Sequence, residues 1–224
     1  MVHLITTMAD TDHNQPRETT YIIEFPNGVR LEILMSDLLN FVADALVNPA
    51  NSNLTHGGGV AGFFRQKAGE SMMRESRAII KAQGSVAAGT CVATTAGDMT
   101  NTKTIIHVVG PNMRDPLPDD AAKGMKKLTL EEGIVLLEAA LDATFAKALS
   151  IGAKSVAIPM ISTGKFKFPK QTAADIFVAK AWDFCLLMAS EGQVMKTISL
   201  VNIDEESTML LIAALKKKQK EEAH

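Results

Sequence analysis

The chain is poor in cysteine, in aromatic residues and in any excess of one charge. Its 224 residues include two cysteines, Cys91 and Cys185, each within an apolar run and without CxxC spacing. This predicts two buried free thiols in a reducing compartment, not a disulfide framework. Aromatic residues make up 5% of the chain and the formal net charge is −2. The low aromatic content argues against a surface on which bases would stack, and the net charge argues against strong overall attraction to nucleic acid. Nucleic acid is therefore not expected as a partner.

Long apolar runs are also missing. No stretch approaches the ~18 consecutive apolar residues of a membrane span, and the N-terminus has no basic flank followed by an apolar core. We therefore expect no membrane contact and a cytoplasmic or nuclear location. The phosphate-loop pattern GxxxxGK[ST] does not occur either. No metal site or cofactor is predicted.

The composition is that of one globular domain. Hydrophobic residues are 46% and charged residues 21% of a chain that is long enough for one sizeable core. We predict a loosely ordered leader over 1–19, one domain over 20–218 and a tail over 219–224, and we expect a monomer. The stretch 111–127, with its prolines, acidic pair and lysines, predicts a long exposed loop.

Strand and helix patterns alternate along this domain. Two β-rich runs around Pro26-Asn27-Gly28 predict a hairpin, and a helical pattern over 59–82 has an expected break near Gly69. Further strands are predicted over 45–47, 90–95, 104–109, 155–161 and 197–203, and further helices over 130–148, 173–189 and 207–220. This alternation predicts an α/β fold with a mixed, largely parallel sheet that is covered on both faces, with the hairpin as an antiparallel edge.

Two loops that follow predicted strands are candidates for ligand binding, because open α/β sheets bind ligands at the carboxyl ends of their strands. The first contains Gly57, Gly58 and Gly59 and leads directly into a helix. Bare backbone ahead of a helix N-terminus suits an anion such as phosphate. The second loop is Ser162 to Pro169, again followed by a helix. Together the loops predict two walls of one pyrophosphate groove.

Residues 57–62 also satisfy GxGxxG, so a nicotinamide-type dinucleotide fold was an alternative. That motif needs a strand that runs straight into the glycines and an acidic residue at the end of the next strand, about 20 positions later. Here the segment 48–56 intervenes and a helix follows. The dinucleotide interpretation therefore fails on its context.

Four segments together resemble the macrodomain family. They are DALVNPANSNLTHGGGVAG (44–62), GTCVATTAGDM (89–99), KTIIHVVGPN (103–112) and SVAIPMISTGKFKFP (155–169). They occur in the expected order within a match that runs from about residue 20 to residue 215. The asparagine-rich entry into a glycine triplet, the IHVVGP strand and the late STG-x-aromatic loop are jointly specific to that family.

The resemblance implies a three-layer α/β/α fold that binds ADP-ribose. It places Asp37 at the adenine amino group, which suits a carboxylate because a carboxylate only accepts hydrogen bonds. The Leu38 backbone would read the adenine ring, and Ile203 falls where many relatives stack an aromatic ring. The diphosphate would lie between two loops, whose residues are Gly57, Gly58, Gly59, Val60 and Ala61 in the first and Ser162, Thr163, Gly164, Lys165 and Phe166 in the second.

The same resemblance implies the candidate catalytic residues. Asn51 would bind the hydroxyls of the distal ribose, and Phe166 would pack on that sugar. His56 borders the glycines and is either a ligand contact with a catalytic role or a turn residue. Asn48 is a weaker candidate, because asparagine before proline often only forms a turn. His107 is predicted to be a packed core histidine.

Two departures from the family pattern bear on activity. One hydrolase branch has an aspartate where this chain has Ala61, so no protein carboxylate is placed to activate water. HGGGVAG is nevertheless similar to viral and some eukaryotic macrodomains that remove ADP-ribose, where the phosphate of the substrate assists. Lys165 and Lys167 stand where relatives usually have an aliphatic residue and a glycine. They either add charge-assisted hydrogen bonds to the diphosphate or point to solvent.

The resemblance leaves three functions open. The leading hypothesis is a metal-free hydrolase that removes mono-ADP-ribose from acidic side chains, with ADP-ribose and mono-ADP-ribosylated proteins as partners. The second is a reader module that binds ADP-ribose without chemistry. The third is hydrolysis of a metabolite such as O-acetyl-ADP-ribose, which shares most contacts with the first.

Overall fold

The computed structural model describes every residue except 1–2, 6–19, 117–123, 125, 192–193 and 223–224. Within this part of the chain, eight strands form one sheet in the order β1-β2-β3-β8-β7-β4-β6-β5. The strands are β1 (His3–Ile5), β2 (Thr20–Glu24), β3 (Arg30–Met35), β4 (Ala45–Pro49), β5 (Thr90–Thr95), β6 (Thr104–Val109), β7 (Ser155–Ile158) and β8 (Thr197–Asn202).

The sheet is parallel in its centre and antiparallel at both edges. The five central strands, β3, β8, β7, β4 and β6, run parallel to one another, as the sequence predicts. The predicted hairpin is β2–β3, joined through the short 3-10 turn η1 (Pro26–Gly28). The second antiparallel edge, β5, was not predicted. It pairs with β6 because the connection 96–103 is too short to cross over and return parallel.

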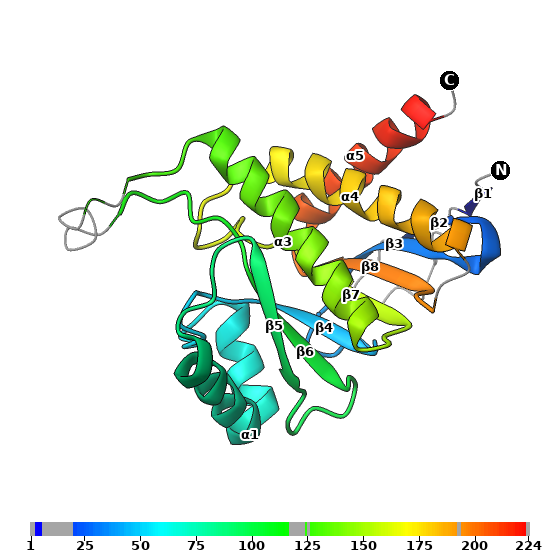
Figure 1. Cartoon of the computed structure of the whole chain (residues 1–224). Coiled ribbons are helices and arrows are strands. Elements are labelled where there is room, and N and C mark those ends of the chain that lie inside the picture. The colour runs from blue at the N-terminus through cyan, green and yellow to red at the C-terminus, as the bar shows by residue number, and fades with distance from the viewer. Residues whose placement is uncertain (1–2, 6–19, 117–123, 125, 192–193, 223–224) are drawn as a thin grey trace.

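Helices cover both faces of the sheet and complete three layers (Figure 1). The helix α1 (Val60–Gln83) lies on one face, and α3 (Leu130–Ser150), α4 (Lys170–Glu191) and α5 (Glu205–Glu222) lie on the other. Strand residues alternate between the faces. Leu46 and Ile105 pack in a cluster with α1, whereas Val47 and Ile106 belong to the cluster formed with α3, α4 and α5.

The break predicted in the first long helix is present at Gly69. This residue has φ +70°, and a Cβ atom there would clash with Oδ2 of Asp98. Only glycine combines that backbone conformation with that close approach. The loop that carries Asp98 therefore packs closely against α1 at the kink, where the Asp98 N–H donates to the Ala68 carbonyl at 3.1 Å.

Three expectations need correction or lie partly outside the described residues. Within the predicted leader, residues 3–5 form β1 and pair with β2, while 1–2 and 6–19 are not described. The strand β7 ends at Ile158, before the predicted end at Ile161, because Pro159 has no N–H to continue the ladder. Of the predicted loop 111–127, residues 117–123 and 125 lie outside the described residues. The described remainder contains neither helix nor strand.

Both cysteines are free thiols, Cys185 buried and Cys91 half-buried. Burial raises the pKa of Cys91 to about 11 and moves the pKa of Cys185 upward as well, so neither is a reactive thiolate. No helix in the described ranges is long and apolar enough to cross a membrane.

Candidate ligand-binding site

A cavity of about 520 Å³ opens where the parallel strands end. Its volume is within the range of small-molecule sites, roughly 300–1,000 Å³. Loops after β3, β4, β6, β7 and β8 contribute to it, because parallel strands place their carboxyl ends at one edge of the sheet. All fifteen residues predicted from the sequence line this one cavity, namely Asp37, Leu38, Asn51, His56, Gly57, Gly58, Gly59, Val60, Ala61, Ser162, Thr163, Gly164, Lys165, Phe166 and Ile203.

Asp37 organises the loop that follows β3. Its Oδ1 accepts the Leu39 N–H at 2.9 Å, and its Oδ2 accepts the side-chain amide of Asn40 at 2.6 Å. Leu38 is buried beside it. A carboxylate has about four acceptor positions, so Asp37 can hold its own loop and still accept a hydrogen bond from a ligand in the cavity.

The glycine loop meets the start of α1 at the cavity wall. Gly59 is the N-terminal cap of α1, and no described side chain caps this end. The first N–H groups of a helix have no partner within the helix, and the helix dipole makes this end positive. Residues 57–61 therefore present backbone donors that suit an anionic group.

Lys165 reaches from the second loop across to the first. Its Nζ lies 2.5 Å from the position that a Cβ atom would take on Gly58, and its Cε lies 3.8 Å from that position on Gly59. The two loops thus converge within the length of one lysine side chain. Because glycine leaves this space open, the ammonium group can lie over the bare backbone of the first loop.

The second loop is a compact turn held by backbone hydrogen bonds, one of them from outside the loop. The Phe168 N–H donates to the Ser162 carbonyl at 3.0 Å, and the Phe166 carbonyl accepts the Met113 N–H at 2.8 Å. Ser162 and Lys167 have left-handed φ values of 67° and 59°. Glycine adopts this conformation more easily than lysine, so Lys167 occupies a position whose backbone favours glycine.

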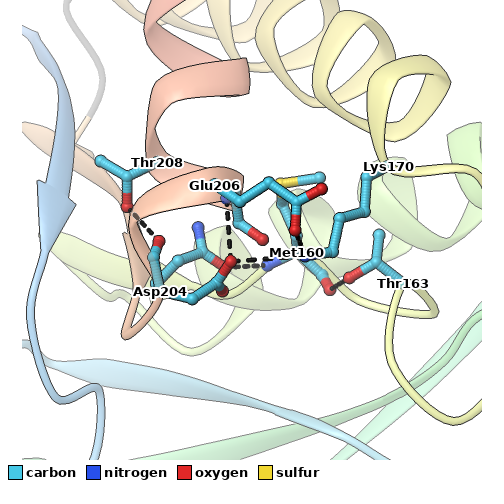
Figure 2. A network of polar contacts seen from close by, with 8 residues as sticks. Met160, Thr163, Lys170, Asp204, Glu206 and Thr208 are labelled. Carbon is cyan, nitrogen blue, oxygen red and sulfur yellow. Dashed lines mark hydrogen bonds and ion pairs between the residues drawn. The ribbon is translucent and has the colours of Figure 1, made fainter.

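A polar network ties this second loop to the start of α5 (Figure 2). The Thr163 hydroxyl donates to the Met160 carbonyl at 2.8 Å, and the Lys170 ammonium contacts Asp204 and Glu206 at 3.4 and 2.5 Å. Partial burial opposes ionisation of Asp204, but the Ser207 N–H and the Lys170 charge hold the pKa of this carboxyl below its usual value. Asp204 is therefore an ionised structural cap of α5.

Asn51 has two hydrogen bonds to a single neighbour. Its Oδ1 accepts the Thr55 N–H at 3.1 Å, and its Nδ2 donates to the Thr55 hydroxyl at 2.7 Å. These bonds fix the orientation of the amide at the edge of the cavity and shape the turn that leads into the glycines.

His56 borders the cavity, but its ring is turned into the protein. The residue is 1% exposed, its Nδ1 lies 3.1 Å from Asn48 Nδ2, and its Nε2 lies 3.1 Å from Ser76 Oγ. Both ring nitrogens are thus engaged within the protein. The predicted catalytic role of His56 needs correction, because no ring nitrogen is free to meet a ligand.

Asn48 joins this ring to the second buried histidine. It lies inside β4 and is fully buried, so its interpretation as a turn former was wrong. Its Nδ2 also lies 2.9 Å from Nδ1 of His107, and the Nε2 of His107 lies 2.9 Å from the Thr94 hydroxyl. An amide that donates to both Nδ1 atoms keeps each ring neutral, with its proton on Nε2. His107 is a packed core residue, as predicted.

Burial sets the charge state of both histidines. Desolvation, with a smaller effect of the Arg65 charge, lowers the pKa of His56 to about 4. Desolvation, with a smaller effect of His56, lowers the pKa of His107 to about 3. Both rings are therefore neutral at pH 7. The hydrogen bonds of this cluster hold His56 in place directly before the glycine loop.

The cavity holds few groups that could act as a base. Among the described residues that line it, the carboxylates are Asp37 and Asp204, and both are already engaged. Ala61 also lines the cavity, is buried and carries no ionisable group. Asp37 and Asp204 thus hold the protein segments on which they lie.

Several lining residues were missed by the sequence interpretation. They include Phe63, Gly110, Pro159, Met160 and Asn202. The Gly110-Pro111 break after β6 was a signal that a strand ends at this edge. The position of Phe63 on the cavity lining had no such signal, because a phenylalanine in an amphipathic helix is ordinarily expected in the core.

An open, largely parallel sheet with glycine-containing loops at its carboxyl edge is typical of the class of α/β proteins that bind phosphorylated ligands. The particular family follows from comparison with known sequences. The model of the Macro domain family matches residues 47–177, more than half of the chain. The chain therefore belongs to the macrodomain family, and the predicted family and fold are confirmed.

Known relatives share sequence along most of the chain. An uncharacterized protein of Thermotoga maritima is 35% identical over 82% of this chain, which spans 28% of that longer protein. A protein of Escherichia fergusonii named O-acetyl-ADP-ribose deacetylase is 33% identical over 81% of this chain and 92% of its own length. A mutant of the Oceanobacillus iheyensis macrodomain, solved with ADPR, superposes with a TM-score of 0.74 at 22% identity, covering 90% of this chain and 99% of its own.

Proposed function

We propose that this chain binds ADP-ribose and hydrolyses mono-ADP-ribose esters on acidic side chains of modified proteins. The observation that carries the proposal is the single cavity lined by all fifteen residues that the macrodomain resemblance implies. Membership of the family and the solved relative with ADPR support the ligand.

The ligand would lie along the cavity with each part meeting a matching group. Adenine would donate its amino hydrogen to Asp37, and the diphosphate would accept N–H groups from residues 57–61 and from the second loop. Lys165, already over Gly58, would add a charge-assisted contact. The distal ribose would meet Asn51 and Phe166.

The reaction would add water across the bond between the anomeric carbon of the distal ribose and the carboxylate oxygen of the modified side chain. The water oxygen bonds to that carbon, and the carboxylate leaves with its electron pair. The water proton passes to a phosphate oxygen of the substrate and then to solvent. The protein contributes position and backbone dipoles, in keeping with a cavity whose carboxylates are both engaged.

Hydrolysis of O-acetyl-ADP-ribose is a second candidate, favoured by the name of the Escherichia fergusonii relative. The ligand and its contacts would be the same. The reaction would differ, because water would add to the acetyl carbonyl carbon, the ribose oxygen would leave and take up a proton, and acetate and ADP-ribose would be the products. A reader without turnover is the third candidate, and the absence of a free carboxylate among the described residues of the cavity lining favours it.

Three measurements on one preparation separate these candidates. Calorimetry with ADP-ribose tests binding. Incubation with an automodified, glutamate-linked ADP-ribosylated protein, and separately with O-acetyl-ADP-ribose, tests turnover by the ADP-ribose released. Loss of the protein label supports the proposal. Binding with no loss over hours overturns hydrolysis of protein esters, and turnover of only the acetyl ester assigns the second candidate.

Paired variants tie any turnover to the cavity. Asn51→Ala removes a residue that lines it, whereas Asn53→Ala removes an exposed asparagine two positions away that does not. We expect Asn51→Ala to abolish most of the turnover and Asn53→Ala to preserve it. Equal activity of the two variants would place the chemistry elsewhere.

A further inference from the structure

Phe63 is an aromatic side chain that the fold leaves uncovered at the cavity. It lies in the first turn of α1, lines the cavity and is 57% exposed. Its neighbour Phe64 is fully buried and packs with Leu38 and Leu39. Phe64 therefore anchors this turn of α1, and Phe63 projects from an anchored helix without a packing partner of its own in the core clusters.

The face of α1 that carries Phe63 adjoins the loop of Asp37. One turn further along the helix, Lys67 contacts the Leu39 carbonyl at 3.4 Å and the side chain of Asn40. Residues four apart lie on the same face of a helix. The Lys67 contacts thus place Phe63 at the end of the cavity that contains Asp37 and Leu38.

The other side chain exposed at this end is aliphatic. Ile203 follows β8, lines the same cavity and is 77% exposed. The loop after β3 lies beside it, because β3 pairs with β8 and the Ser36 N–H donates to the Asn202 carbonyl at 2.9 Å. Phe63 is therefore the aromatic ring near Asp37 among the described residues that line the cavity, since Phe166 belongs to the second loop.

We propose that Phe63 is the stacking residue of the base subsite and makes this end of the cavity selective for a flat aromatic base. This inference rests on the proposed binding of ADP-ribose. A base whose edge is bonded at Asp37 leaves its two faces to the neighbouring side chains. Offset or edge-to-face contact with a phenyl ring stabilises such a base beyond the area it buries. Ile203 would contribute only the apolar area that the base buries against it.

Calorimetry with ADP-ribose on three variants tests this role. Phe63→Ala should weaken binding about 2- to 12-fold, the range expected for one aromatic contact. Phe63→Tyr keeps the ring and should bind as the wild type does. Val135→Ala is the matched control, because Val135 is an exposed apolar residue on α3 outside the cavity. As Phe63 is largely exposed, its truncation leaves the core intact.

A fluorescence variant gives an independent measurement. The chain has a single tryptophan, Trp182, which is 2% exposed and packs against Phe25 in the core. In Phe63→Trp, a new exposed indole should be quenched by ADP-ribose but not by ribose 5-phosphate, which has no base.

The outcomes separate this inference from the proposed function. If the wild type does not bind ADP-ribose, the proposed function fails together with the inference. If the wild type binds but Phe63→Ala has the same affinity, only the inference fails. Retained calorimetric binding without quenching in Phe63→Trp overturns it as well.

Discussion

Acid should destabilise this protein in a pH window set by two buried histidines. In the folded state the pKa of His56 is about 4 and that of His107 about 3, while both are near 6.5 in an unfolded chain. The unfolded chain therefore binds more protons than the folded one below pH 6.5. By linkage, the free energy of unfolding falls as the pH drops through this window.

The size of the loss follows from the same values. Between pH 7 and pH 5, each histidine should lower the free energy of unfolding by roughly 2 kcal/mol, and the pair by roughly 4 kcal/mol. The carboxyls of Asp44 and Asp204 also have lowered pKa values. Their contribution is present above their unfolded value of 3.8 and is lost only below it, so it does not enter this window.

The geometry around Asn48 gives the physical reason. Its side-chain amide faces Nδ1 of both rings, at 3.1 Å for His56 and 2.9 Å for His107. A proton added to either Nδ1 would place two donors against each other. Because His56 directly precedes Gly57, opening of this cluster should also loosen the glycine loop.

Urea unfolding followed by circular dichroism at pH 7 and pH 5 measures the effect, with the slope against urea checked for constancy. The variant His56→Gln removes one titrating ring and keeps an amide donor toward Ser76. Its loss between the two pH values should be about half that of the wild type. A wild type equally stable at both pH values would refute the reasoning, as would an identical loss in His56→Gln.

Three further predictions concern the cavity. Asn51→Ala should lower turnover far more than ADP-ribose affinity. Thr55→Val removes the hydroxyl that accepts from the Asn51 amide and should lower turnover less than Asn51→Ala does. Equal losses of turnover and affinity in Asn51→Ala would contradict an aligning role for Asn51. Asp37→Ala should weaken ADP-ribose binding by ~1–3 kcal/mol by calorimetry, and unchanged affinity returns Asp37 to a loop-forming role. Lys165→Met should weaken ADP-ribose binding and reduce the dependence of the affinity on salt concentration. Lys167→Met is the control, because Lys167 lies outside the cavity lining. If the affinities of the two variants depend on salt equally, Lys165 does not contact the diphosphate.

Features encoded by adjacent residues could be predicted from the sequence. Positive φ at Asn27 and Gly28 produces the hairpin turn, Gly69 breaks α1, and the glycine run 57–59 ends at the N-terminus of a helix. Each depends on what the local backbone can adopt, and glycine and asparagine reveal that directly. The alternation of strands and helices likewise predicted a parallel sheet whose carboxyl edge carries the site.

Side-chain direction was decided only by tertiary packing. The sequence places His56 beside the glycines, but its ring is turned inward by Asn48 and Ser76, which lie 8 and 20 positions away. Phe63 and Phe64 are adjacent and chemically identical, yet one is 57% exposed at the cavity and the other is fully buried. A helical spacing of apolar residues indicates that a helix has an apolar face. Which of its residues meets solvent, core or cavity depends on the distant segments that the fold brings against it.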